Sequence, residues 1–267
     1  MMDVVRLAIH GAAGRMGKRL VALGTSDPSF QLVAAIEHSG NSDLGRDAGL
    51  VAGVAEAGVL LSSSLDFAAD VVIDFSLPDS ALALVRSCVT HKRPLVLATT
   101  GMSEEQKQEV RTAGLEIPIV WAPSMSMAVN LTMKLASIAG DVLKDAPGGT
   151  DVEIIERHHR YKEDAPSGTA LKFGELIAEA MGQTKHQHGR EGQTGQRMHN
   201  EIGYHAVRVG DNPGEHTIVF GLLGETIELT VRASNRDCYA LGALQAAKFI
   251  ANKGPGLYSM YDVLGLS

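Results

Sequence analysis

Cysteine is scarce in this sequence, with only Cys88 and Cys238 among 267 residues. Two cysteines so far apart offer neither a disulfide framework nor the close spacing of a metal site. Such sparse use of cysteine is typical of proteins in a reducing compartment. No apolar run approaches the roughly 18 residues that a membrane-spanning helix needs. No charged segment with an apolar stretch and a cleavage site precedes the first strand pattern. We therefore expect no signal peptide, no membrane association and a cytoplasmic location.

Dense basic clusters are also missing. The formal net charge is −7 at pH 7, and no block of Lys and Arg stands out. Nucleic acid is therefore not expected as a partner, whereas an anionic metabolite is compatible with a local basic site. Aromatic residues make up only 4% of the chain, but 45% of it is hydrophobic and 21% charged, as in ordinary globular proteins.

Strand and helix patterns alternate through the first half of the chain. The expected strands are 4–10, 31–37, 71–75, 94–99 and 117–121, and the expected helices between them are 15–23, 79–91 and 103–113. Strands that alternate with helices of this length form βαβ crossovers and hence a parallel sheet. We therefore predict an α/β fold in which residues 1–126 form a Rossmann-like, doubly wound domain.

The pattern changes after Pro123. A long amphipathic helix is expected at 127–143, with Leu131, Leu135 and Ile138 on one face. The other expected elements are strands at 151–157, 202–209, 216–222 and 226–233, helices at 167–181 and 237–251, a long polar loop at 184–200 and a hairpin turn at 221–224.

No helices separate the last three of these strands. We therefore predict that residues 127–236 form an α+β domain with an open mixed sheet. Alternating Ile, Val and Leu positions over 202–233 predict an apolar sheet face that other copies of the chain cover. The C-terminal segment 237–267 is expected to be helical and to pack back on the first domain.

A glycine-rich loop, Gly11-Ala-Ala-Gly14-Arg-Met-Gly17, lies between the first strand and the first helix. Backbone amides at a helix N-terminus hold pyrophosphate, and glycine lets the phosphate approach closely. Taken alone, the loop is equally typical of a structural turn. Glu37, 20 residues after Gly17, favours a dinucleotide, because a carboxylate at the end of the second strand accepts the hydroxyls of the adenine ribose. The alternative is an ordinary exposed glutamate.

Two further segments, Ala98-Thr-Thr-Gly101 and Ala122-Pro-Ser-Met125, each follow a predicted parallel strand. The carboxyl ends of parallel strands share one edge of a sheet, where open α/β folds bind their ligands. Each segment by itself is an unremarkable turn. As a set with the glycine loop, they outline one crevice, so residues 1–126 are predicted to be a dinucleotide-binding domain.

The densest polar chemistry lies between Glu156 and Thr169, in the string E-R-H-H-R-Y-K-E-D-A-P-S-G-T. His158 and Lys162 are candidate proton donors, because the environment tunes imidazoles and desolvated amines toward neutral pH. The chain must curl for both to reach one substrate, and the following Asp-Ala-Pro favours such a turn. No third ligand at the usual spacing accompanies the two histidines, so no metal site is expected.

Ser167 is expected to cap the helix that follows this string. The amides of Gly168 and Thr169 then point outward at the positive end of the helix, which favours a carboxylate. Residues 127–236 are therefore predicted to bind the substrate and to form the oligomer. The alternative is that one of the two adjacent histidines is structural and that the other basic residues are solvated surface.

Together these segments resemble the 4-hydroxy-tetrahydrodipicolinate reductase (dihydrodipicolinate reductase) family. The likeness rests on Gly11-x-x-Gly-Arg-Met-Gly17, Thr99-Thr-Gly101, Asn130 and Glu153-Ile-Ile-Glu-x-His-His-x-x-Lys-x-Asp-Ala-Pro-Ser-Gly-Thr-Ala170, and it extends over essentially the whole chain. It implies reduction of a cyclic imine dicarboxylate at C4 by NADH or NADPH, with loss of water, in the diaminopimelate route to lysine. It also implies a homotetramer assembled through the open sheet.

The resemblance also implies roles for individual residues. His158 acts as the general acid/base and Lys162 as a proton donor. The implied substrate contacts are His159, Ser167, Gly168 and Thr169. The implied cofactor contacts are Gly11, Ala12, Ala13, Gly14, Arg15, Met16, Glu37, His38, Ala98, Thr99, Thr100, Ala122, Pro123, Ser124 and Met125.

Three residues depart from the family pattern. Ala98 replaces a common glycine, Ser124 replaces a common asparagine beside the nicotinamide, and His38 stands where an arginine often contacts the 2′-phosphate of NADP. Glu37 favours a free 2′-hydroxyl, and His38 attracts a phosphate only when it is protonated. We therefore expect use of both cofactors, with NADH equal or preferred near neutral pH.

Two other functions stay open at this point. Another Rossmann dehydrogenase of a small anionic substrate would share the glycine loop but not the His-His-x-x-Lys string. A regulator that binds dinucleotide without turnover would have no need of two proton donors beside a carboxylate site.

Overall fold

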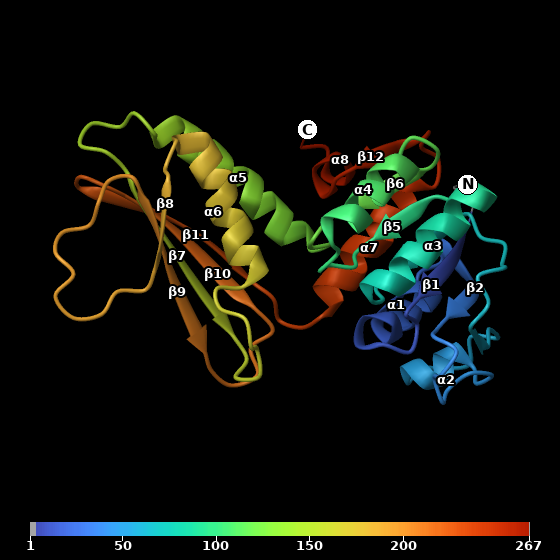
Figure 1. Cartoon of the computed structure of the whole chain (residues 1–267). Helices are drawn as coiled ribbons and strands as arrows, with labels where there is room; N and C mark the ends of the chain where they lie inside the picture. The colour runs from blue at the N-terminus through green and yellow to red at the C-terminus, as the bar shows by residue number, and fades with distance from the viewer. Residues whose placement is uncertain (1–3, 267) are drawn as a thin grey trace. The chain divides into compact units, whose positions relative to one another are not determined.

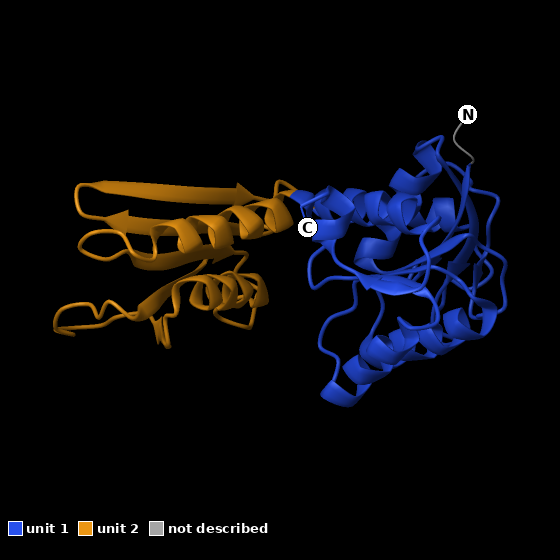
Figure 2. Ribbon diagram, turned by 90° about the horizontal axis from the view of Figure 1, so that it is seen from above, with its two compact units in different colours: residues 1–127, 236–267 blue, residues 128–235 orange. Residues whose placement is uncertain are grey.

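The computed structural model describes residues 4–266. They divide into two compact units, of which unit 1 runs to residue 127 and resumes at residue 236, and unit 2 comprises residues 128–235 (Figure 2). The predicted fold class is confirmed, because unit 1 contains a parallel sheet with helices on both faces and unit 2 a mixed sheet. Over residues 4–266, no helix has the length and apolar character needed to span a membrane.

Unit 1 is built on a seven-stranded sheet in the order β12-β6-β5-β4-β1-β2-β3, with every neighbouring pair parallel. The strands are β1 (Val5–His10), β2 (Phe30–Ile36), β3 (Leu61–Ser62), β4 (Val71–Asp74), β5 (Leu95–Leu97), β6 (Pro118–Trp121) and β12 (Gly256–Tyr258). The chain runs outward from β1 in one direction to β3, and then continues on the other side of β1 with β4. Such a reversal opens a ligand-binding crevice at the carboxyl ends of the two strands.

Helices cover both faces of this sheet, which explains why β4 and β5 are buried along their whole length. The helices of unit 1 are α1 (Arg15–Ser26), α2 (Ala48–Ala52), α3 (Pro78–His91), α4 (Glu104–Ala113), α7 (Asp237–Ile250) and α8 (Met260–Leu264). Leu20 of α1 and Leu244 of α7 share one core cluster with Leu7 of β1. Leu84 of α3 shares the core on the other face with Val72 of β4.

The sequence predicted a helical C-terminal segment over 237–267, and this prediction is wrong for part of its described residues. Helix α7 ends at Ile250, and Gly256–Tyr258 then forms β12, which pairs in parallel with β6. Pro255, which lies between the two elements, cannot donate a helical hydrogen bond, so a helix could not continue through it to the C-terminus. The prediction missed β12 because three residues are too short for a recognisable alternation.

Unit 2 contains a five-stranded mixed sheet in the order β11-β10-β7-β9-β8. Its elements are α5 (Met127–Leu143), β7 (Asp151–His158), α6 (Gly168–Met181), β8 (Lys185–His188), β9 (Glu201–Arg208), β10 (Glu215–Leu222) and β11 (Glu225–Arg232) (Figure 1). β10 is antiparallel to β7 and β11, whereas β9 is parallel to β7 and β8. The predicted hairpin turn is confirmed, since Leu222 pairs with Glu225.

The prediction of a loop throughout residues 184–200 is wrong for Lys185–His188, which form the edge strand β8. This stretch has no alternation of apolar and polar residues that would indicate a strand. Its position depends instead on long-range contacts with Tyr204 of β9. The His186 Nδ1 atom lies 2.7 Å from the Tyr204 hydroxyl, and the His188 ring stacks on the Tyr204 ring at 5.1 Å between centroids.

One face of the unit 2 sheet is apolar, and the chain's own helices cover it. Ile154, Tyr204, Ile218 and Phe220 on this face are at most 2% exposed. Helix α6 lies so close that a Cβ atom on its Gly174 would meet the Tyr204 hydroxyl at 1.6 Å. The expectation that the apolar positions of β9 and β10 await other copies of the chain is therefore wrong.

The opposite face of the sheet has no helix of unit 2 against it and carries a mixture of side chains. Ile155 and Val207, which point to this face, are 41% and 42% exposed. They alternate in register with charged residues such as Glu153 and Arg157 on β7. Any partner of this face must therefore match charge as well as apolar surface.

Helix α5 has the predicted stripe of Leu131, Leu135 and Ile138 on one face, but this face is 44–49% exposed. The face that packs instead contains Val129, Met133 and Ala136. Both faces are apolar, so periodicity alone did not indicate which of them is buried.

Candidate active site

The glycine loop joins β1 to α1 and has the shape that a pyrophosphate requires. Gly11 has a φ of +77°, in the left-handed region, and a Cβ atom on Gly17 would lie 2.0 Å from the Gly11 carbonyl oxygen. No side chain caps α1 at Gly14. The amides of the first turn, at Arg15 and Met16, therefore have no intrahelical acceptor and are available to an anion. These residues fit the phosphates of a dinucleotide.

Glu37 lies immediately after β2 and contacts this loop. Its Oε2 atom accepts a hydrogen bond from the Ala13 amide at 3.0 Å, and its Oε1 atom accepts one from the His38 amide at 3.0 Å. The carboxylate is thus held beside the glycine loop, where an adenine ribose would lie. The His38 ring is exposed, and its Nδ1 atom accepts a hydrogen bond from the Gly40 amide at 3.2 Å.

The other two predicted segments follow β5 and β6 at the same edge of the sheet. Thr100 and Pro123 are exposed there and Ser124 is half-buried. Thr99 and Met125, by contrast, are 5% and 1% exposed. The last two residues therefore support the crevice from beneath.

A buried carboxylate that the sequence analysis overlooked connects three of these loops. Asp74 ends β4 and is 0% exposed. Its Oδ1 atom lies 2.6 Å from His10 Nδ1 and accepts a hydrogen bond from the Ser76 hydroxyl at 2.6 Å, while its Oδ2 atom accepts one from Thr99 at 2.5 Å. Asp74 thereby fixes the loops after β1, β4 and β5 relative to one another. The sequence signal that could have identified this carboxylate is the aspartate at the end of the otherwise apolar string V-V-I-D.

In unit 2, His158 ends β7 and is 8% exposed. Its Nδ1 atom lies 2.6 Å from Oε2 of Glu156, a carboxylate that is only 1% exposed. A Cβ atom at Gly214 would lie 3.0 Å from His158 Nε2, so glycine keeps the space beside that nitrogen open. The imidazole is thus held at Nδ1 by Glu156, while its Nε2 atom lies beside Gly214.

The Glu156 carboxylate also binds two groups from distant parts of the chain. Arg208 donates to both of its oxygens, at 2.7 and 2.8 Å, and the Ser167 amide donates to Oε1 at 3.0 Å. Burial opposes ionisation of Glu156, but the hydrogen bonds from His158, Arg208 and Ser167 outweigh it and lower its pKa to about 2. Glu156 is therefore an anion at neutral pH.

The segment after His158 curls, as its turn residues predict. The His159 amide donates to the Asn212 carbonyl at 2.8 Å, and the Lys162 amide donates to the His159 carbonyl at 3.1 Å. Lys162 is 22% exposed, and its Nζ atom lies 2.7 Å from Asp164 Oδ1. Its ammonium group is therefore held by a carboxylate that is itself 60% exposed, an arrangement from which it can turn to a ligand.

A third histidine, His216, completes this group, and the sequence analysis gave it no separate role. Its ring lies edge-on to His158, with 5.2 Å between centroids, and is 4% exposed. Burial, together with the charges of His158 and Lys162, lowers the pKa of His216 to about 4, so it is neutral at pH 7. Its Nδ1 atom, like that of His159, is buried without a hydrogen-bond partner among the described residues.

Helix α6 begins beside this cluster. The Ser167 hydroxyl accepts a hydrogen bond from the Ala170 amide at 3.2 Å, as predicted for an N-cap, and Ser167 itself is 2% exposed. Gly168 is exposed, and a Cβ atom there would meet nothing within 4 Å. The amides of Gly168 and Thr169 belong to the first turn of this 14-residue helix, where backbone N–H groups have no intrahelical acceptor and the helix end is positive.

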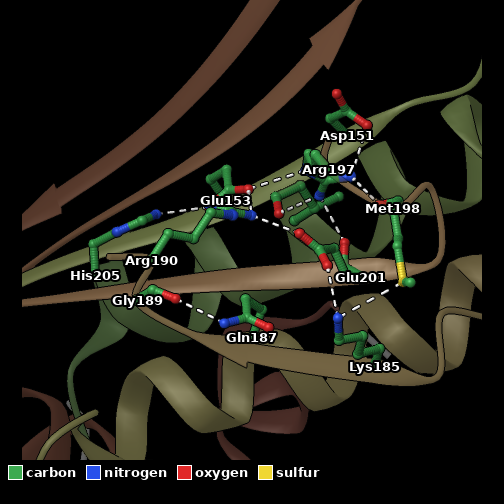
Figure 3. A network of polar contacts seen from close by, with 11 residues as sticks. Asp151, Glu153, Lys185, Gln187, Gly189, Arg190, Arg197, Met198, Glu201 and His205 are labelled. Atoms are coloured by element: carbon green, nitrogen blue, oxygen red, sulfur yellow. Dashed lines mark hydrogen bonds and ion pairs between the residues drawn. The ribbon is translucent and has the colours of Figure 1, made fainter. Parts of the chain in front are cut away.

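A second polar cluster lies near the other end of β7, where Glu153 is surrounded by basic groups (Figure 3). Arg190, Arg197 and His205 contact its carboxylate at 2.7–3.1 Å. Burial opposes ionisation of Glu153, but these three partners lower its pKa to about 2. This network attaches the segment after β8 to the open face of the sheet. Among residues 4–266, neither this cluster nor any other group of His, Cys, Asp and Glu has the arrangement of a metal site.

Comparison with known proteins agrees with this division of the chain. Residues 5–125 match the family model "Dihydrodipicolinate reductase, N-terminus", and residues 128–264 match "Dihydrodipicolinate reductase, C-terminus". The chain is 64% identical to the 4-hydroxy-tetrahydrodipicolinate reductase of Rhodopirellula baltica, with 98% of this chain and 97% of that protein covered. It is 47% identical to the enzyme of that name from Alkalilimnicola ehrlichii, with 98% and 99% covered.

Solved structures are similar as well. A dipicolinate-bound dihydrodipicolinate reductase from Paenisporosarcina sp. TG-14 has a TM-score of 0.79 at 28% identity, with 98% of this chain and 99% of that chain covered. An amine dehydrogenase from Mycobacterium smegmatis, with a TM-score of 0.67 at 12% identity and 96% and 95% covered, shares the fold alone. Because the two family models span nearly the whole chain and a curated relative is 64% identical, this chain belongs to the dihydrodipicolinate reductase family of oxidoreductases.

Proposed function

We propose that this chain reduces 4-hydroxy-tetrahydrodipicolinate to tetrahydrodipicolinate with a nicotinamide dinucleotide, in the diaminopimelate route to lysine in the cytoplasm. The observation that carries the proposal is the pairing of His158 with buried Glu156 beside the open N-terminus of α6. This pairing places a proton donor next to a carboxylate-binding helix end. The substrate, a cyclic dicarboxylate, requires both.

Unit 1 supplies the cofactor site in this proposal. The loop from Gly11 to Met16 holds the pyrophosphate, Glu37 and His38 lie at the adenine ribose, and the segments 98–100 and 122–125 line the nicotinamide end. When bound, the nicotinamide supplies a hydride to C4 of the substrate ring. Both NADH and NADPH fit this assignment, with NADH equal or preferred because Glu37 repels a 2′-phosphate.

Unit 2 supplies the substrate site. The amides of Gly168 and Thr169, with His159, bind the carboxylates, and Ser167 holds the helix end in place. Reduction at C4 moves electrons toward C3, which must then accept a proton. His158 is the general acid for this step, and Lys162 donates protons as well as attracting the anionic substrate.

The proposal is tested by following NADH absorbance in the presence of the coupled product of dihydrodipicolinate synthase. The expected result is consumption of NADH that depends on this product. A different Rossmann dehydrogenase would leave NADH unconsumed with this substrate, and so would a regulator, which would bind the dinucleotide without turnover. Calorimetric titration with NADH then distinguishes a chain that binds the dinucleotide without consuming it from a chain that binds no cofactor.

Cofactor choice gives a separate prediction. In the wild type, the ratio of NADPH affinity to NADH affinity should rise as the pH falls from about 8 to about 6, because an imidazole gains its charge over this range. His38→Arg should favour NADPH and flatten the trend, because guanidinium stays charged. Calorimetry on both proteins at the two pH values measures this. The 2′-phosphate's own ionisation near pH 6 opposes the trend, so an identical pH dependence in both proteins would exclude His38 as a phosphate contact.

The N-terminus of α6 gives another testable prediction. Gly168→Ala is expected to raise the KM for substrate about tenfold, the equivalent of one lost charge-assisted hydrogen bond. The reason is that the new methyl group would occupy space that is empty in this structure. Because Cβ atoms tilt toward the helix N-terminus, it would narrow the approach to the first-turn amides. Its Tm should not fall, because alanine favours helices. Steady-state kinetics and thermal unfolding measure the two effects. An unchanged KM in a stable variant would remove this helix end from the substrate site.

We also propose that the chain assembles as a homotetramer through the open face of the unit 2 sheet. Exposed Ile155 and Val207 on this face support the assignment. Light scattering at micromolar concentration is expected to give about four times the chain mass of 28.3 kDa. Ile155→Lys should lower this mass, whereas Leu135→Lys, an equally exposed position on α5, should not. A wild type that is only monomeric would exclude the assembly.

A further inference from the structure

Glu156 is only 1% exposed, yet it contacts both the candidate general acid His158 and the N-cap residue Ser167 of α6. One of its oxygens lies 2.6 Å from His158 Nδ1, and the other accepts the amide of Ser167, the N-cap of α6. Arg208 donates to both oxygens and also to the Asp164 carbonyl at 2.7 Å. Strands β7 and β9 and the turn before α6 therefore meet at one carboxylate.

We propose that Glu156, clamped by Arg208, is the positioning residue of the reaction, fixing the tautomer of His158 and the place of the α6 N-terminus together. The proposal rests on the proposed function and assigns to this pair a role that the family resemblance did not supply. The carboxylate can only accept at His158 Nδ1, so that nitrogen must carry a proton. Nε2, beside Gly214, is then the nitrogen that faces the substrate.

The proton balance follows from this arrangement. In the acid form both ring nitrogens of His158 are protonated, and Nδ1–H donates to Glu156. During the reaction the Nε2–H bond breaks and a C3–H bond forms on the substrate, which leaves a neutral imidazole with its Nδ1 proton still on Glu156. The carboxylate takes no proton, because Arg208 and the Ser167 amide hold it as an anion. A fixed carboxylate behind an imidazole plays the same part in hydrolase triads.

Arg208 is needed because a lone buried carboxylate is unstable. A carboxylate that is 1% exposed requires a partner of opposite charge. The bidentate geometry of the guanidinium also fixes the plane of the carboxylate, so that one oxygen is directed to His158 and the other to Ser167. The Arg208 side chain is itself 18% exposed and therefore also well shielded from water.

Glu153 provides a matched control on the same strand. It too binds arginines and a histidine, and its pKa is also lowered to about 2. It points to the opposite face of the sheet from Glu156 and His158, and its partners are Arg190, Arg197 and His205. Glu153→Asp and Glu156→Asp remove the same methylene group from two carboxylates that each bind arginine and histidine.

The first experiment compares these two variants in the NADH assay and in thermal unfolding. Glu156→Asp is expected to lower kcat about 10²-fold, the scale of a displaced catalytic group, and to raise KM, because aspartate cannot reach His158 and Ser167 at once. NADH affinity should stay the same. Glu153→Asp should keep its kcat despite a comparable loss of Tm. Equal kcat values in the two variants would overturn the proposal, since Glu156 would then be only structural.

The second experiment reads the tautomer directly and needs no substrate. In protein labelled with ¹⁵N-histidine, the His158 resonances are assigned by their absence from the His158→Gln spectrum. The wild type is expected to show the Nδ1–H tautomer when neutral, and the double variant Glu156→Gln with Arg208→Gln a mixture or the Nε2–H form. A wild type in the Nε2–H form would overturn the proposal even if Glu156→Asp did not fold. If NADH is not consumed at all, the proposed function fails, whereas the NMR result still decides the positioning role.

Discussion

Replacement of His158 by glutamine is expected to lower kcat by about 10²-fold or more, the usual contribution of a positioned general acid. Glutamine retains a polar side chain of similar reach but cannot deliver a proton at neutral pH. NADH affinity should be nearly unchanged, because His158 belongs to unit 2 and the glycine loop to unit 1. The coupled NADH assay measures kcat, and calorimetry measures cofactor affinity.

The neighbouring residues serve as controls for this result. His159→Gln should act mainly on KM, because His159 is assigned to the substrate carboxylates. Lys162→Ala should lower kcat and also raise KM, since an ammonium near a dicarboxylate serves in both binding and proton supply. A His158→Gln variant with the kcat of the wild type would refute the assignment of the general acid.

The second large effect is expected from Gly17→Ala in the glycine loop. The new Cβ atom would lie 2.0 Å from the Gly11 carbonyl oxygen and 2.6 Å from Ala12 Cα, distances that no packed protein tolerates. The loop must therefore move away from α1, which should cost about 1–3 kcal/mol of unfolding free energy. Because the same backbone would hold the pyrophosphate, NADH affinity should fall at least about tenfold. Denaturant unfolding and calorimetry measure the two losses.

Gly254→Ala is the matched control in the same unit, because a Cβ atom there would meet nothing within 4 Å. It is expected to change neither stability nor NADH affinity. A Gly17→Ala protein that folds and binds NADH as well as the wild type would show that the loop is a structural turn and not a phosphate site. That outcome would leave the assignment of unit 1 as the cofactor domain without its main support.

Much of this protein follows from local sequence patterns. Helix α5 begins and ends at the predicted residues, and most strands lie within two residues of their predicted bounds, because periodicity and turn residues act over short distances. The His-His-x-x-Lys string and the Ser-Gly-Thr that follows it are likewise local, and so the curl at Lys162 and the cap at Ser167 were predictable. The glycine loop was recognisable because it must follow a strand and open a helix.

The sequence by itself determined the two kinds of sheet, the glycine loop and the positions of His158 and Lys162. Only the tertiary structure decided which groups surround them. Arg208 lies 52 residues from Glu156, and Asp74 lies 64 residues from His10, so strand pairing alone creates these contacts. The same holds for β8, β12 and the buried faces of α5 and the unit 2 sheet. Periodicity places residues on a common face, but which face is covered depends on long-range packing, which no local pattern encodes.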